Sequence, residues 1–309
     1  QAEDGIRDFC LSRGLGDVYK RQKLYNMNHF EKFQEALEIE QKSENTFTLI
    51  PNTNYFVGNT PHGGYLMAVM HRALTNVLPH STAISSSVQY LDRIDPEPIT
   101  LEVETFKAGR GSSSGIVKLI QNNRVCTTFT GTCSDFNHMK GFDGLETALP
   151  KIFNDKDKSD YVALNYDEIT KGFTPSFIHQ LECSIHPDHV WWKREKNTDS
   201  SQYDARCSAY LKMGGGKPDQ FCLSFYSDIL PPVVCNKYGA LGWVPTITLT
   251  THIRQLPTTE DIYADFKATD INKGYFEQDC NLWDLNGNLV ASSRQLTRIL
   301  KSEEKLSQQ

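Results

Sequence analysis

The chain has 309 residues, 39% of them hydrophobic, and a net charge of −6. This length is enough for two domains with ordinary cores. A mildly acidic chain with no basic tract argues against nucleic acid as its main partner. No apolar run approaches the roughly 18 residues of a membrane helix. The composition therefore favours a globular protein over a nucleic-acid-binding or membrane-spanning one.

The first 26 residues are predicted to be a non-native tail. They precede the first methionine, Met27, and residues 1–22 show no apolar periodicity and resemble a translated sequencing adapter. No apolar segment follows their basic residues, as a signal peptide would require. Seven cysteines remain beyond this tail, and none forms a C-x-x-C pair. An odd count without a signal peptide favours free thiols in a reducing compartment, so we expect a cytoplasmic protein.

An amphipathic helix opens the first module. Over residues 62–78, apolar side chains fall at i, i+3, i+4, i+7, i+8 and i+11 from Leu66, which is one stripe of an α-helix. Gly63 and Gly64 leave backbone N–H groups uncovered at its start, where the helix dipole favours an oxygen atom or an anion. The alternative is a buried helix with a flexible cap. Extended segments are expected next, at 84–94, 99–104, 115–120 and 125–133, with a hairpin turn at Asn122-Asn123.

The same order of elements recurs after a polar, charged linker. We expect strands at 185–192 and 205–213, a helix over 219–230, and strands at 246–253, 262–268, 276–285 and 289–300, with a type I′ turn at Asn286-Gly287. A helix against an antiparallel meander, twice, is an α+β architecture. The predicted fold is a double hotdog, in which each sheet wraps around a central helix. Its parts are an N-terminal hotdog (27–140), a linker (141–178) and a C-terminal hotdog (179–309).

Three segments resemble the acyl-CoA thioesterase II group and the wider thioesterase-like, double-hotdog superfamily. They are the sequence VET at 103–105 with the hairpin that follows, FYSD at 225–228 in the second helix, and LVASSRQ at 289–295 in the last strand. The resemblance implies hydrolysis of an acyl-CoA thioester to the free acid and CoA. It also implies acyl-CoA as the partner and no cofactor.

The same resemblance implies that an Asp, a Thr or Ser, and a Gln hold the attacking water. Asp228, Thr246 and Gln295 match these positions. Their chemistry agrees, because an aspartate beside an apolar stripe is partly desolvated, which raises its pKa toward that of a useful general base, and a glutamine both donates and accepts. The family often has an Asp where this chain has Thr248, so either threonine is a candidate to face the water. The alternatives are an exposed aspartate, a solvent-facing glutamine and threonines that serve strand propensity.

Substrate contacts are expected at both ends of the thioester. The backbone N–H groups of Gly63 and Gly64, or those at the start of the second helix, are candidates to receive the thioester oxygen. His62 either contacts the substrate or caps the helix, and Thr248 is a further candidate contact. For the phosphates of CoA the candidate cations are Arg93, Lys107 and Arg110, each of which is otherwise ordinary surface charge.

Several rival functions share parts of this pattern. A non-catalytic acyl-thioester-binding protein has the same fold, as does an enoyl-CoA hydratase, but a hydratase needs an Asp–His pair and none is evident around Asp228. The sequence GSSSG at 111–115 leads into a strand rather than a helix, which argues against a serine hydrolase. His186 and His189 flank Pro187 outside any H-E-x-x-H pattern, so we predict surface histidines and no metal site. A homodimer is possible, since hotdog proteins commonly pair.

Overall fold

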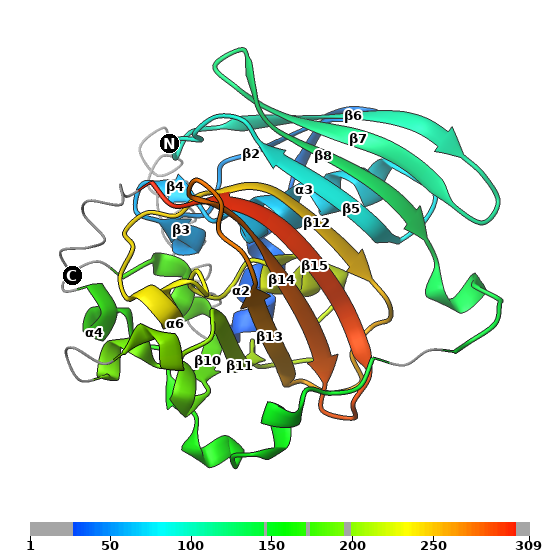
Figure 1. Ribbon diagram of the computed structural model, residues 1–309. Helices are drawn as coiled ribbons and strands as arrows, with labels where there is room; N and C mark the ends of the chain where they lie inside the picture. Colours follow the sequence, from blue (N-terminus) through cyan, green and yellow to red (C-terminus); the bar gives the residue numbers. More distant parts are fainter. Residues whose placement is uncertain (1–26, 145–146, 171–173, 195–198, 301–309) are drawn as a thin grey trace, which may run out of the picture.

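The computed structural model describes residues 27–300 apart from 145–146, 171–173 and 195–198 (Figure 1). The predicted non-native tail, residues 1–26, lies outside this part of the chain. One antiparallel sheet of 13 strands passes through the molecule in the order β1-β2-β6-β7-β8-β5-β12-β15-β14-β13-β11-β10-β9. The strands of the N-terminal half (α2 to β8) therefore stay together on one side, and those of the C-terminal half (β9 to β15) on the other.

The N-terminal half places a long helix, α3 (Gly63–Val77), beneath a curved sheet (Figure 1). Ten of its 15 residues are buried, so α3 is a central helix rather than a surface one. Strand β7 (Ser113–Gln121) alternates between buried and half-buried residues, which puts one face of the sheet on the helix. The other elements are α2 (His29–Ala36), β1 (Glu40–Ser43), β2 (Thr46–Leu49), β3 (Phe56–Val57), β4 (Thr60–Pro61), β5 (Thr82–Tyr90), β6 (Ile99–Ala108) and β8 (Arg124–Ser134).

The C-terminal half repeats this plan with a shorter central helix, α5 (Gln220–Tyr226). Asp219 begins the helix as its N-cap, because its side chain accepts hydrogen bonds from the N–H groups of Phe221 and Cys222. The other elements are β9 (Val162–Ala163), α4 (Tyr166–Thr170), β10 (Glu182–Ile185), β11 (Arg206–Lys212), α6 (Cys235–Tyr238), β12 (Thr246–Ile253), β13 (Ile262–Ala268), β14 (Tyr275–Asp284) and β15 (Leu289–Arg298).

Strands β5 and β12 join the two halves edge to edge. Ser87 lies opposite Thr250, and their hydroxyl oxygens are 2.8 Å apart. Beneath this junction α3 contacts α5, since Nδ1 of His71 lies 3.0 Å from Oγ of Ser224 while Nε2 accepts the N–H of Ala83. Burial lowers the pKa of His71 to about 3, so the ring is neutral and Nδ1–H donates to Ser224. The halves thus share one interior.

The structure confirms the α+β class and the double hotdog. The helix expected at 62–78 is α3, and the strand expected at 246–253 has the bounds of β12. The turn at Asn122-Asn123 has positive φ at both residues, 53° and 58°, as a type I′ hairpin requires. Across the described residues, no helix is both long and apolar enough to cross a membrane.

Three local predictions were wrong. The helix expected over 219–230 ends at Tyr226, well before Pro231. The strand expected at 185–192 ends at Ile185, and a 3-10 helix, Pro187–His189, follows it. At Asn286-Gly287 only the glycine has positive φ, 84°, because the Asp284 carboxylate accepts the N–H groups of residues 286 and 288 and so organises a wider loop.

Strand β6 on one side and helix α3 below leave no room for a side chain at one position in β7. A Cβ atom on Gly115 would lie 2.6 Å from the main-chain oxygen of Glu104 and 3.2 Å from Cδ1 of Leu74. We therefore expect Gly115→Ala to lower the free energy of unfolding by about 1–3 kcal/mol. Gly111→Ala is the matched control, because a Cβ there meets nothing within 4 Å. Urea unfolding followed by circular dichroism measures both, and equal stabilities would contradict this packing.

Candidate active site

The carboxylate of Asp228 lies between the two halves of the molecule. It follows the end of α5, and its Oδ2 accepts the backbone N–H of Gly64 at 3.0 Å, at the start of α3. Its Oδ1 accepts the Thr246 hydroxyl at 3.4 Å. The side chain is only 12% exposed. The sequence predicts that the N-terminus of α3 receives an oxygen atom or an anion. In the structure, the carboxylate of Asp228 fills this position.

The surroundings of Asp228 make it a stronger base than an ordinary aspartate. Burial raises its pKa, because a desolvated carboxylate is less stable in its charged form. The hydrogen bonds from Gly64 and Thr246 favour the charged form and offset part of this effect. The net shift remains upward, in the direction that suits a general base.

His62 holds Asp228 by its main chain. Its Nε2 lies 3.0 Å from the carbonyl oxygen of Asp228, so Nε2–H donates and Nδ1 carries the lone pair. Nε2 is also 3.7 Å from Oδ2 of the same residue. The ring packs on Phe177 and Phe225, with centroids 4.3 and 5.4 Å away. Burial lowers the pKa of His62, which favours a neutral ring that orients the aspartate.

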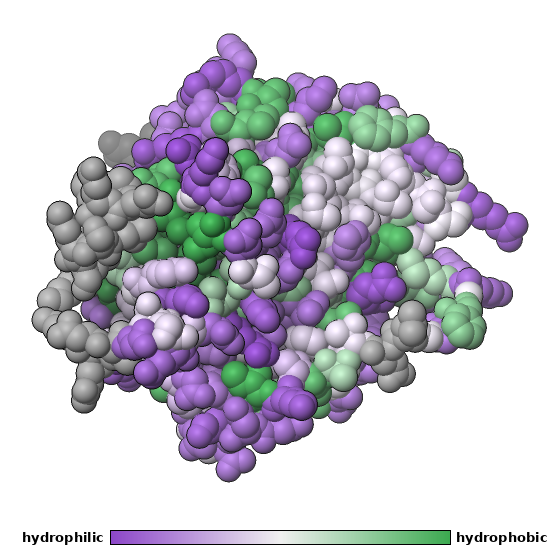
Figure 2. Space-filling view, in the orientation of Figure 1, coloured by the Kyte–Doolittle hydropathy of each residue, from purple (hydrophilic) through white to green (hydrophobic). Residues whose placement is uncertain are grey.

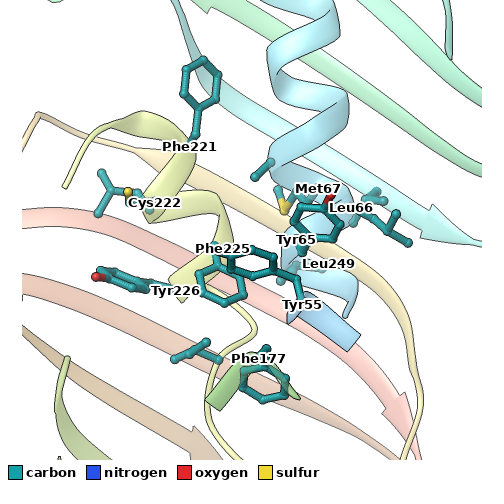
Figure 3. Close-up of a cluster of buried hydrophobic side chains, with 14 of the residues drawn as sticks. Tyr55, Tyr65, Leu66, Met67, Phe177, Phe221, Cys222, Phe225, Tyr226 and Leu249 are labelled. Atoms are coloured by element: carbon teal, nitrogen blue, oxygen red, sulfur yellow. The ribbon is translucent and has the colours of Figure 1, made fainter. Parts of the chain in front are cut away.

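An aromatic cluster supports this arrangement from below (Figure 3). Tyr55 stacks on Tyr65 of α3, with ring centroids 5.0 Å apart, and meets Phe225 of α5 edge-on at 5.8 Å. Figure 3 shows Phe177 beside these rings, next to the chain that leaves α5. The residues before Asp228 are thus fixed by packing, which limits the movement of its carboxylate.

A bulge in β12 decides which threonine faces Asp228. Thr246 lies opposite Thr297 of β15, whereas Thr248 lies opposite Leu296, and the register shifts between them. Opposite residues share a face of the sheet. Thr246 therefore lies on the same face as Thr297 and Gln295, and Thr248 lies on the other. Gln295 is 6% exposed, and its Oε1 is buried without a hydrogen-bond partner in the described chain.

One cavity of about 1180 Å³ brings these side chains together. Asp228, Thr246 and Gln295 all line it, and so do His62 and Gly63 from the other half. Apolar side chains make up much of the remaining wall. On the face drawn in Figure 2, hydrophobic residues gather over β3 and β4, which also contribute to the cavity. The apolar lining includes Val57, Leu66, Leu91, Ile94, Ile169, Phe177, Trp191, Ile229, Leu230, Leu241, Trp243 and Val244.

The structure corrects three of the expected substrate contacts. Thr248 lies on the opposite face of β12 because of the bulge. Lys107 and Arg110 lie near the hairpin between β6 and β7, where the Arg110 main-chain oxygen contacts His80, just before β5. The cavity lies at the other end of β5, roughly 25 Å away along the strand. Arg93 does line the cavity, and its side chain is 61% exposed.

Two expectations about polar groups also change. The Gly64 N–H was a candidate to receive the thioester oxygen, but it already donates to Asp228. No Asp–His pair was evident around Asp228 in the sequence, yet the fold supplies His62 from the other half. Sequence reasoning also missed Tyr90, which lines the cavity at the end of β5. The sequence signal that could have identified Tyr90 is the period of two along a strand. Tyr90 lies two residues after Val88, which is fully buried, so both side chains lie on the same face.

The sequence predicts that His186 and His189 lie at the surface, and this prediction was wrong. Both are buried, at 0% and 5% exposure. Nε2 of His186 lies 3.0 Å from the Asp155 carboxylate, and Nδ1 of His189 accepts the N–H of Ser208. These contacts tie the predicted linker to β10 and β11, because the 3-10 helix turns both rings inward.

The fold defines a class, the proteins of the double-hotdog fold. Two family models place the chain more narrowly: the acyl-CoA thioesterase N-terminal domain matches residues 52–134, and the acyl-CoA thioesterase C-terminal domain matches residues 156–299. The chain therefore belongs to the acyl-CoA thioesterase family.

Relatives agree with this assignment at the level of the fold. An uncharacterized protein of Mycobacterium tuberculosis is 24% identical over 263 residues, which is 80% of this chain and 89% of that one. A Thermobifida fusca structure, provisionally assigned as a thioesterase II, has 24% identity and a TM-score of 0.74 over 89% of this chain and 99% of that one. Acyl-CoA thioesterase II TesB2 of Mycobacterium marinum has 14% identity and a TM-score of 0.63, covering 88% and 98%.

The raised pKa of Asp228 predicts a stability cost at neutral pH. Because the pKa is higher in the folded chain than in the unfolded one, the folded state loses stability as pH rises from the ordinary value of 3.8 through the raised value. We expect Asp228→Asn to raise the melting temperature at pH 8 by roughly 2 to 4 °C, and by less at pH 5. Scanning fluorimetry measures this, with the exposed Asp143 changed to Asn as the control. An unchanged or lower melting temperature at pH 8 would contradict the prediction.

Proposed function

We propose that this protein hydrolyses acyl-CoA thioesters to a free acid and CoA. The observation that carries the proposal is the convergence of Asp228, Thr246 and Gln295 on one cavity, with the pKa of the aspartate raised. A carboxylate, a hydroxyl and an amide offer the acceptors and donors that hold one water molecule. Orientation of that water is a large part of the acceleration that such a site can give.

The proposed reaction needs one proton transfer and one leaving group. Asp228 takes a proton from the bound water as the water oxygen forms a bond to the thioester carbon. The carbonyl electron pair moves onto its oxygen, and it returns when the carbon–sulfur bond breaks. CoA leaves as a thiolate and receives the proton that Asp228 holds. Gly64 and His62 keep the carboxylate in position throughout.

The cavity fits an acyl-CoA in size and chemistry. Its volume, about 1180 Å³, exceeds the roughly 300–1,000 Å³ of a typical small-molecule pocket. Its apolar wall suits an acyl chain, and the guanidinium of Arg93 is the cation we assign to the CoA phosphates. The seven free, buried cysteines among the described residues support a reducing, cytoplasmic setting as part of this proposal.

Hydration of an enoyl thioester is the second candidate, because His62 and Asp228 form the Asp–His pair that such a reaction uses. Nε2 of His62 is 3.7 Å from Oδ2 of Asp228. However, Nε2–H already donates to the Asp228 carbonyl oxygen. The ring therefore cannot offer that proton to a substrate without breaking a buried hydrogen bond, and hydrolysis remains the better supported function.

Thr246 and Thr248 provide a matched pair to test the site. We expect Asp228→Asn to reduce kcat by about a hundredfold or more, because the base is lost. We expect Thr246→Ala to reduce it by about tenfold, since one hydrogen bond to the carboxylate is lost. Thr248→Ala should change it less than twofold, because this side chain lies on the other face of the sheet. Release of free thiol from a series of acyl-CoA chain lengths measures all three.

Other results of the same assay would point elsewhere. Tight acyl-CoA binding without thiol release would identify a non-catalytic binding protein. Formation of 3-hydroxyacyl-CoA from enoyl-CoA would identify a hydratase. An equal loss of activity in the two threonine variants would contradict the register of β12.

The raised pKa of Asp228 also predicts the pH dependence of hydrolysis. The base must be ionised, so kcat/KM should fall as pH drops through the pKa of Asp228 in the free enzyme. This fall should have its midpoint above 3.8, the ordinary value, because burial raises the pKa. Initial rates between pH 3 and 9 measure the profile. A midpoint at or below 3.8, or the same midpoint in Asp228→Asn, would show that Asp228 is not the base.

A further inference from the structure

Tyr90 reaches the cavity from the N-terminal half, opposite the residues that hold the water in the proposed reaction. It is the last residue of β5 and shares a face of the strand with the fully buried Val88. It lines the same cavity as Asp228 and Gln295. Its hydroxyl is buried and has no hydrogen-bond partner in the described part of the chain. A buried phenol without a hydrogen-bond partner lowers the stability of the fold. A ligand in the cavity that accepts this hydrogen bond would explain why a tyrosine occupies the position.

The Tyr90 hydroxyl lies close to the carboxylate of Asp228. A Cβ atom built on Gly63 would lie 2.6 Å from Oδ2 of Asp228 and 3.0 Å from Oη of Tyr90. The two oxygens are therefore near neighbours, and Gly63 leaves their surroundings free of a side chain. Both residues line the cavity, so one thioester group bound there can meet the phenol and a water held by the carboxylate.

The protonation state of Tyr90 suits a hydrogen-bond donor. Burial raises its pKa well above 10.0, and the negative charge of Asp228 raises it further. The phenol therefore keeps its proton at neutral pH. That O–H makes no hydrogen bond in the described structure, so it is available to a ligand.

We propose that Tyr90 is a further catalytic residue, whose O–H donates to the thioester carbonyl oxygen. This inference rests on the proposed function. As water attacks, the carbonyl electron pair moves onto the oxygen, and the Tyr90 hydrogen bond stabilises the resulting negative charge. The proton stays on Tyr90, and the charge leaves with the CoA thiolate when the carbon–sulfur bond breaks. Gly64 cannot share this role through its N–H, which donates to Asp228.

Kinetics of Tyr90→Phe test the proposal. We expect kcat to fall by about a hundredfold, the usual scale for one oxyanion donor, with KM changed less than threefold. Tyr226→Phe is the matched control, because it also removes a buried hydroxyl without a described partner. Tyr226 does not line the cavity, and it points away from α3 (Figure 3). Equal kcat values for wild type and Tyr90→Phe would overturn the proposal.

A spectroscopic measurement separates this proposal from the failure of hydrolysis itself. Acyl-CoA with a 13C-labelled carbonyl is bound to Asp228→Asn, with and without Tyr90→Phe, and the carbonyl stretch is recorded by infrared difference spectroscopy. We expect a lower stretching frequency when the Tyr90 hydroxyl is present. This result would support the contact even if wild type releases no thiol, an outcome that would refute only the proposed function. The same frequency in both variants would overturn the Tyr90 proposal, whatever the rate of hydrolysis.

Discussion

The hydrogen bond between the Asp228 carboxylate and the Gly64 N–H connects the two halves of this protein at its chemical centre. One partner follows α5 and the other begins α3, 164 positions earlier in the chain. The N-terminus of α3 carries part of a positive charge, which helps a buried carboxylate to ionise. His62 reinforces the contact through the main chain of the same aspartate. Neither half can therefore form this site alone.

The continuous sheet sets the geometry around that contact. Pairing of β5 with β12 places Tyr90 and Thr246, at the ends of adjacent strands, on the wall of one cavity. The bulge in β12 then turns Thr246 rather than Thr248 toward Asp228. A single extra residue in a strand thus selects the side chain that the site uses, which is a common role for bulges next to active sites.

The site is built at a cost to the stability of the fold. Burial disfavours the charge of Asp228, and the Tyr90 hydroxyl and the Gln295 carbonyl oxygen lack partners in the described chain. Some buried polar groups away from the cavity, such as His71, are satisfied within the protein, whereas others, such as the Tyr226 hydroxyl, are not. What sets Tyr90 and Gln295 apart is that both line the cavity, where a ligand can supply the missing partner.

The architecture and three side chains of the candidate site can be predicted from the sequence. The apolar stripe of α3 and the alternation of the strands encode local structure directly, because burial follows their periods. Asp228, Thr246 and Gln295 were matched by family resemblance. That His62 and Tyr90 join them, and that Lys107 and Arg110 do not, becomes evident only in three dimensions. Those outcomes depend on strand register and on contacts between distant segments, which local periodicity does not specify.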